Sequence, residues 1–234
     1  MPALAIVLAT VCSYGVGWIV GIPLLVPVLN TLAAFPFMVS ALRRGDVRLA
    51  IVRMLVWALT LGVCATLLSY YQPWRTDSLF LRGASYRTEM FAWVMTGRGA
   101  ESRPAEFLPQ HAAHAGVFAL LALATGGTAA MPMGAALMNY MGHYVGTLAA
   151  ASRRPVATLF LAWHPWSVIR IASFVAMGVA LSAPLLGRAG RFQVNWAAAK
   201  TALAWAAAGL VTDVVLKWLL APAWQRLLLH VVGW

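Results

Sequence analysis

Hydrophobic residues along this chain form long uninterrupted runs that short charged stretches separate. Residues 3–41 carry no charged side chain, and residues 112–152 carry none either. A run of about 20 apolar residues is long enough to cross the hydrocarbon core of a bilayer as a helix, because that core is about 30 Å thick. The apolar positions are continuous and do not alternate with polar ones, so the pattern predicts helices and not the strands of a membrane barrel.

The runs predict an all-α, polytopic helical membrane protein with about six transmembrane spans and one re-entrant or interfacial helix. The uncharged run 3–41 has room for two spans that turn near Gly21–Pro23, where glycine and proline interrupt a helix. We expect the whole chain, 1–234, to form a single membrane domain. The four remaining spans are expected at 51–71, 130–151, 167–187 and 195–220.

The run 112–152 is about twice as long as one crossing needs. Arg153 and Arg154 follow it, and positive side chains collect on the cytoplasmic side of membrane proteins. One crossing leaves this pair in the cytoplasm, whereas two crossings do not. We therefore predict a re-entrant or interfacial helix at 111–124, a break at the glycines that follow, and then one span.

Residues 72–110 form the one sizeable polar segment and contain four of the six acidic residues. The alternation of spans places this segment outside, as an external amphipathic segment. Tyr86, Met90, Trp93 and Val94 share one face of a helix there, which is typical of a helix that lies on the membrane interface.

Two further expectations concern the ends of the short helix in the polar segment and the C-terminal end of the chain. Ser85 and Gly97 are expected to begin and end the short helix of the polar segment, as an N-cap and a left-handed C-terminal residue. Residues 221–234 are expected to lie on the cytoplasmic interface as a helix. With six spans, both termini are expected in the cytoplasm.

Composition agrees with a membrane protein and excludes several soluble classes. The chain is 62% hydrophobic and only 10% charged, whereas soluble domains carry about 25% charged residues. The net charge of +11 comes from arginines at the ends of apolar runs, which the positive-inside rule explains without nucleic-acid binding. The glycine-rich "TGRGAES" has no following Lys-Ser or Lys-Thr, so no nucleotide site is predicted.

The partners implied are the lipid bilayer, together with membrane-protein subunits or a second copy of the chain. Arginine outnumbers lysine 15 to 2, which is typical of a GC-rich bacterial gene. We therefore expect a multi-pass protein of the bacterial cytoplasmic (inner) membrane.

Histidines near the end of the polar segment are candidate metal ligands. His111 and His114 lie three apart, so their imidazoles share a helix face and can reach one ion. Glu106 precedes them, and His143 can approach from the adjoining span. A divalent metal is therefore a candidate cofactor, although histidines that pack at a lipid–water boundary account for the same spacing.

Polar residues beside a glycine stripe mark a candidate substrate path through the membrane. Gly142 and Gly146 form a GxxxG pattern that allows close helix contact, and polar side chains in membranes usually face protein or water. Hydrogen bonding between packed helices accounts equally well for them. The candidate path residues beside this stripe are Asn139, Tyr140, His143 and Tyr144. Asn30 is a further candidate because it lies in the first hairpin, where prolines interrupt the helices and expose backbone groups that can bind a substrate.

The last span contains two opposite charges, Asp213 and Lys217, spaced four residues apart. Side chains at this spacing meet on a helix, and pairing lowers the cost of placing charges in a membrane. We expect them to form an ion pair with each other. Arg170 lies near the start of its span and is expected to extend its guanidinium toward the membrane surface.

Three functions are consistent with these patterns. Interrupted helices and polar groups along glycine-rich spans favour a small membrane transport protein or the membrane subunit of a transport complex. The first alternative is a membrane enzyme whose site at the outer interface uses Glu106, His111 and His114 with Glu89, Glu101 or His143. The second alternative is a non-catalytic assembly or scaffold subunit.

Overall fold

The computed structural model describes residues 2–234. Helices make up 86% of the structure, and the described residues contain no strand. The long runs of the sequence form seven helices of 18 residues or more, and four shorter elements connect them. In chain order the elements are α1 (Pro2–Val20), α2 (Leu25–Leu42), α3 (Val47–Tyr71), α4 (Pro73–Leu79), α5 (Gly83–Thr96), the 3₁₀ turn η1 (Ala100–Ser102), α6 (Pro104–Thr125), α7 (Ala130–Ala150), α8 (Pro155–Ala162), α9 (Pro165–Gly190) and α10 (Trp196–Val232).

Six helices are long and apolar enough to cross a membrane: α1, α2, α3, α6, α9 and α10. The fold is therefore that of a helical polytopic membrane protein, as the apolar runs predict. The number six agrees with the expectation, but its members differ, because α6 belongs to the six and α7 does not. Asn139 and His143 lower the hydropathy of α7, and both side chains are buried inside the protein.

The helix expected at 111–124 is longer than its apolar run. α6 has 22 residues and begins at Pro104, whose missing N–H costs nothing at the first helical position. Gly126 ends the helix in a left-handed conformation (φ +59°), and Gly127 continues the turn at φ +90°. The break at these glycines is confirmed, and the helix before it has the length of a full crossing.

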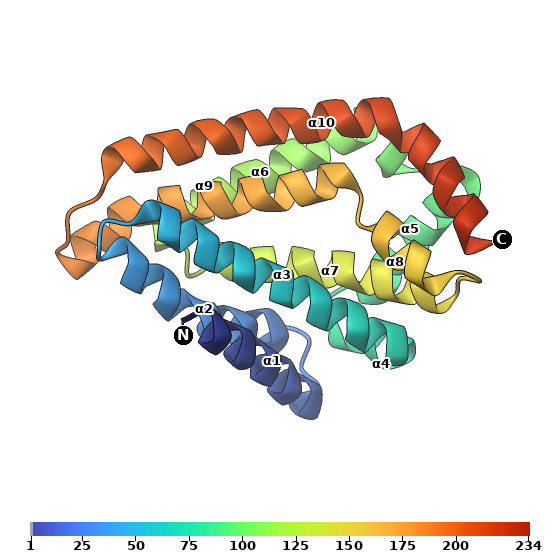
Figure 1. Cartoon of the computed structure of the whole chain (residues 1–234), viewed down its shortest axis with the longest axis horizontal. Helices are drawn as coiled ribbons and strands as arrows, with labels where there is room; N and C mark the ends of the chain where they lie inside the picture. Colours follow the sequence, from blue (N-terminus) through green and yellow to red (C-terminus); the bar gives the residue numbers. More distant parts are fainter. Residues whose placement is uncertain (1) are drawn as a thin grey trace.

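The centre of the molecule is the contact between α3 and α7, which run side by side in Figure 1. The GxxxG pattern makes this contact close. A Cβ on Gly142 would lie 2.6 Å from the Cβ of Ala65, and one on Gly146 would overlap the carbonyl oxygen of Thr66. Residues 141–149 of α7 are all buried, so its polar side chains face protein and not lipid.

The short elements α4, α5, η1 and α8 gather at one end of the bundle, where α3 and α7 finish (Figure 1). We call this end the α4–α5 end. The opposite end carries the loops that join α2 to α3 and α9 to α10, and the turn between α6 and α7. The polar segment of the sequence is thus folded against the ends of the long helices.

The apolar face of α5 packs on the protein, and the expectation that it lies on the membrane interface is wrong. Met90, Trp93 and Val94 are buried in one cluster with residues of α7 and α10. An apolar stripe fits a membrane surface and a neighbouring helix equally well, so the sequence pattern does not distinguish them. Gly97 ends α5 at φ +68° as expected, but Ser85 does not cap its start: its hydroxyl donates to the carbonyl of Arg82.

The C-terminal residues continue α10, which runs 37 residues through Pro222 and bends toward its end in Figure 1. Several hydrogen bonds hold this end to the rest of the protein, including one from the indole of Trp224 to the carbonyl of Leu161 at 2.8 Å. Gln225 Nε2 donates to the carbonyl of Val94 at 2.5 Å, and the backbone N–H of Arg153 donates to the carbonyl of Val232 at 3.0 Å. The segment expected as a separate interfacial helix, 221–234, is therefore joined to α10 without a break.

Candidate functional site: a cavity between the long helices

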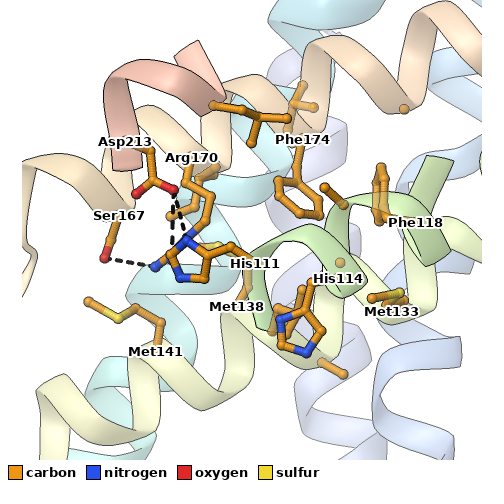
Figure 2. A pocket seen from close by; sticks show the side chains of 18 of the residues that line it. His111, His114, Phe118, Met133, Met138, Met141, Ser167, Arg170, Phe174 and Asp213 are labelled. Atoms are coloured by element: carbon orange, nitrogen blue, oxygen red, sulfur yellow. Dashed lines mark hydrogen bonds and ion pairs between the residues drawn. The ribbon is translucent and has the colours of Figure 1, made fainter. Parts of the chain in front are cut away.

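A cavity of about 770 Å³ lies between α2, α3, α6, α7, α9 and α10. Residues of α5 and η1 also line it, and we call the part where Arg82, Ser85 and Glu89 are exposed its mouth. Sites for drug-sized ligands have volumes of about 300–1,000 Å³. Figure 2 shows Asp213, Arg170, His111 and Ser167 gathered on one side of the cavity and the rings of Phe118 and Phe174 with Met133 on the other. The cavity is thus large enough for a ligand and differs in polarity along its length.

The apolar part is walled by flexible and aromatic side chains from α2, α3, α6, α7 and α9. Methionine side chains adapt to irregular shapes, and aromatic rings add large flat surfaces. The apolar lining includes Met38, Met54, Trp57, Phe118, Met131, Met133, Met138, Met141, Phe174 and Val179.

The polar part lies toward the α4–α5 end and gathers residues from six elements, α5, η1, α6, α7, α9 and α10. Only His111 and His114 among them were candidate metal ligands from the sequence, and only Tyr140 was a candidate path residue. The polar lining includes Arg82, Ser85, Tyr86, Glu89, Glu101, Gln110, His111, His114, Tyr140, Ser167, Arg170 and Asp213.

Arg170 of α9 points into this polar part, so the expectation that it reaches for the membrane surface is wrong. One terminal guanidinium nitrogen donates to Nε2 of His111 at 2.5 Å, and the other donates to the hydroxyl of Ser167 at 3.1 Å (Figure 2). Asp213 is the nearest carboxylate, with 3.9 Å between its Oδ2 and the guanidinium. Arg170 is therefore held by neutral groups and only weakly paired with a charge.

Asp213 is almost fully buried, with 1% of its side chain exposed. Its Oδ2 lies 3.4 Å from Nδ1 of His111, and its Oδ1 has no hydrogen-bond partner in the described structure. A buried carboxylate with a free oxygen is costly, because burial removes the water that would satisfy it. The three side chains of Asp213, His111 and Arg170 thus form a loosely paired cluster on three different helices.

Lys217 binds Glu101 and not Asp213, so the predicted ion pair within the last span is wrong. Its ammonium donates to Oε1 of Glu101 at 2.9 Å and lies 4.6 Å from the ring centre of Phe107. Burial of Glu101 raises its pKa, but the attraction of Lys217 and Arg170 and the hydrogen bond from Lys217 together outweigh that effect, and the pKa is lowered to about 2. The turn η1 brings Glu101 to the helix, which spacing along the sequence cannot reveal.

Two further buried groups beside the cluster keep their neutral forms. Burial raises the pKa of Tyr86, and the nearby charge of Glu101 raises it further. Burial lowers the pKa of His164, in the connection between α8 and α9, to about 3. Tyr86 is therefore a phenol and His164 a neutral imidazole near pH 7.

His143 lies outside the cavity in a hydrogen-bonded chain with Ser69 and Asp77. Its Nδ1 is 2.9 Å from the Ser69 hydroxyl, its Nε2 is 2.8 Å from Asp77, and Asp77 also pairs with Arg87 at 2.9 Å. The order resembles a nucleophilic triad. Ser69 and His143 are fully buried and line no described cavity, so a substrate has no place beside the hydroxyl. The chain fixes α7 against α3 and α4.

The other candidate path residues serve helix packing. Tyr14 donates to Oδ1 of Asn139, Asn139 donates to Oδ1 of Asn30 at 3.4 Å, and Asn30 donates to the hydroxyl of Ser13 at 2.8 Å. All four are buried, and the network ties α1 and α2 to α7. Tyr144 is also buried, with its hydroxyl 3.4 Å from Nε2 of His164.

The four candidate metal ligands lie in three different places. Glu106 pairs with Arg103 on the exposed surface at 2.8 Å, His143 binds Asp77, and His111 and His114 line the cavity. Across residues 2–234, no group of three or more His, Cys, Asp and Glu side chains is arranged to hold a metal ion.

Arg170 and Tyr86 are the site residues that the sequence patterns missed, and Glu101 was predicted only as a residue of the enzyme alternative. The one signal for Arg170 was an arginine several residues inside an apolar run, which is rare unless the side chain faces protein or water. The chain matches no family model, no curated protein and no solved structure. The chemistry of the cavity is therefore the basis for a function.

Proposed function

We propose that the protein is a membrane transport protein that carries an amphiphilic molecule through the cavity between its long helices. The single observation behind the proposal is the cavity, which joins a polar, ionisable part to an apolar part between candidate spans. A ligand with a charged or polar group and an apolar body matches both parts at once. The high share of arginine supports a bacterial inner-membrane location for this activity.

Transport is supported over the alternatives by where the polar groups lie. An enzyme at the outer interface would need Glu106 beside the histidines, and Glu106 pairs with Arg103 on the surface instead. A scaffold needs no cavity, and packing normally fills the interior of a protein that has only a structural role.

Transport requires that both ends of the cavity become open to water in turn. Two serines mark these ends. Ser85 lies on α5 at the mouth and is exposed, whereas Ser182 lies on α9 beside Gly127, near the opposite end, and is buried. A cysteine at each position reports access from its own side of the membrane.

The test uses Ser85→Cys and Ser182→Cys in a chain whose Cys12 and Cys64 are replaced by serine. A membrane-impermeant thiol reagent is applied to sealed vesicles of each orientation. We expect the Ser85 position to react from one side and the Ser182 position from the other. Thr212→Cys, on an exposed part of α10 outside the cavity, is the matched control and should stay unlabelled inside the bilayer. Protection of the Ser182 position from both sides, with the Ser85 position labelled, would contradict transport.

A further inference from the structure

We infer that the ligand of the cavity is an anionic amphiphile, with a carboxylate or phosphate group bound by Arg170 and an apolar body along the methionine and aromatic wall. The inference rests on the proposed function, because both place the ligand in the same cavity. It adds the sign of the ligand's charge and the residue that binds it.

Arg170 has the spare hydrogen-bonding capacity that an anion needs. A guanidinium carries five N–H donors, and the described structure gives Arg170 only the acceptors His111 and Ser167. About a quarter of its side chain (24%) is exposed, and it lines the cavity. A cation among apolar helices with free donors is costly alone, and a planar carboxylate or phosphate satisfies it.

The carboxylates of the polar part are poorly placed to bind a cation instead. Asp213 lines the cavity with only 1% of its side chain exposed, and its Oδ2 faces His111 and Arg170. Glu101 is occupied by Lys217 at 2.9 Å. Glu89 is exposed on α5 at the mouth, where Arg82 also lies. The accessible charge deep in the polar part is therefore the positive charge of Arg170.

Neutral groups around Arg170 add donors. Burial raises the pKa of Tyr86, so its hydroxyl keeps the proton that it can donate to an anion. Gln110 contributes an amide to the same lining. Sites for carboxylates and phosphates commonly combine a guanidinium with neutral donors. The guanidinium matters most, because a charge-assisted hydrogen bond is stronger than one between neutral groups.

The ligand can enter the cavity either from the membrane or from water. α6 packs mainly against α9 and only lightly against α7, and the lining residues Ala112 and Leu137 on those two helices are not buried. We expect a single-chain lipid anion to enter between these two helices, where the lining residues are not buried. The mouth at α5 admits a water-soluble aromatic or aliphatic acid. Both sources share the chemistry of one anionic group on an apolar body.

The test measures binding of matched probes to the full chain in lipid nanodiscs. The probes are dansyl-labelled undecanoate and a dansyl-labelled undecylammonium of the same length, with empty nanodiscs as the baseline. We expect the anion to bind about tenfold or more tightly than the ammonium, as for a charged hydrogen-bond partner. Laurate and 2-naphthoate serve as competitors. Displacement by laurate alone assigns a lipid source, displacement by both assigns a source in water as well, and each supports the anion.

Variants assign the effect to the residue. Arg170→Gln should remove the preference for the anion, and Arg170→Lys should keep most of it, because the lysine retains the charge. Arg188→Gln, on the same helix but exposed at the opposite end and outside this cavity, is the control and should bind like the unchanged protein. Thermal unfolding of each variant confirms that it is folded.

Two results would overturn the inference in different ways. Tighter binding of the ammonium, or equal binding of the anion by folded Arg170→Gln, overturns the binding of an anion by Arg170 and leaves the cavity as a ligand site. Binding of neither probe above the empty-nanodisc baseline, in protein that unfolds cooperatively, overturns the ligand inference and the proposed function together.

Discussion

Arg170 donates a hydrogen bond to Nε2 of His111, with 2.5 Å between the two nitrogens. A guanidinium can only donate, so Nε2 carries no proton, and His111 is a neutral imidazole whose proton is on Nδ1. That nitrogen faces Asp213 Oδ2 at 3.4 Å. His111 thus lies between Arg170 and the nearest carboxylate and keeps the two charges only weakly paired, which leaves Arg170 free for a ligand.

The first prediction concerns Asp213, the weak competitor for Arg170. Asp213→Asn removes a negative charge 3.9 Å from the guanidinium and keeps the shape of the side chain. We expect the affinity for dansyl-undecanoate to rise by about tenfold, or about 1.4 kcal/mol, because the guanidinium then has no carboxylate of the protein beside it. Titration of the probe in nanodiscs measures it. Weaker binding of the anion by folded Asp213→Asn would show that the aspartate supports the ligand and does not compete with it.

The second prediction concerns Lys217, whose side chain is 1% exposed and whose ammonium binds Glu101 at 2.9 Å. Lys217→Met leaves Glu101 without its partner, and we expect a loss of about 3 kcal/mol of stability, typical of breaking a buried pair. Adding Glu101→Gln to this variant should recover part of the loss. Lys200→Met, on the exposed surface of the same helix, is the control and should change stability by less than about 0.5 kcal/mol. Equal unfolding midpoints for Lys217→Met and Lys200→Met would show that the pair contributes nothing.

The third prediction is a loss of stability in mild acid through His164. Burial lowers its pKa to about 3 in the folded protein, below the ordinary value of 6.5. The unfolded chain therefore binds a proton first as the pH falls, and stability is lost from about pH 6.5 downward until the folded pKa is reached. Between pH 6.5 and 5 the loss should be about 1–2 kcal/mol. Thermal unfolding across this range measures it.

Two variants isolate the His164 effect. His164→Gln should flatten the stability profile between pH 6.5 and 5, whereas His230→Gln, at an exposed position, should not. The Glu101 contribution falls in a different range: its pKa is lowered from 4.5 to about 2, so its stabilisation is complete above about pH 4.5 and disappears as the pH falls toward 2. Parallel profiles for the two histidine variants would contradict the assignment.

The fourth prediction concerns the sides of the membrane on which the termini lie. Six spans would place both ends in the cytoplasm. In the fold, however, α7 has 21 residues, about 32 Å of helix, and it runs beside α3. If α6 and α7 both cross, seven helices span the membrane and the termini lie on opposite sides. A reporter that works only in the cytoplasm, fused to each terminus in turn, measures on which side that terminus lies. Activity from both fusions would support six crossings.

The sequence patterns predict the helices well because each depends on its own run of residues. The turn near Gly21–Pro23, the helix ends at Gly97 and Gly126, and the close contact at Gly142 all follow from local backbone chemistry. These features need no knowledge of distant residues, so one sequence is enough to find them.

The site itself depends on residues that meet only in the folded chain. Spacing along α10 predicts that Asp213 can reach Lys217, but it cannot show that η1 brings Glu101 to the lysine. The same spacing places His111 and His114 on one face without showing that Arg170 of α9 faces them. Side-chain partners across helices are therefore the part of the candidate site that a single sequence does not determine.

The most direct test of the cavity as a ligand site is native mass spectrometry of the protein purified under mild conditions. Ala115 of α6 lines the cavity, whereas Ala113 is exposed on the same helix and lies outside it, so Ala115→Phe and Ala113→Phe form a matched pair. We predict that the unchanged protein and Ala113→Phe carry a co-purified amphiphile, which organic extraction identifies as an anion, and that Ala115→Phe does not. Equal occupancy in both variants, or a bound ligand with a cationic group, would contradict this account.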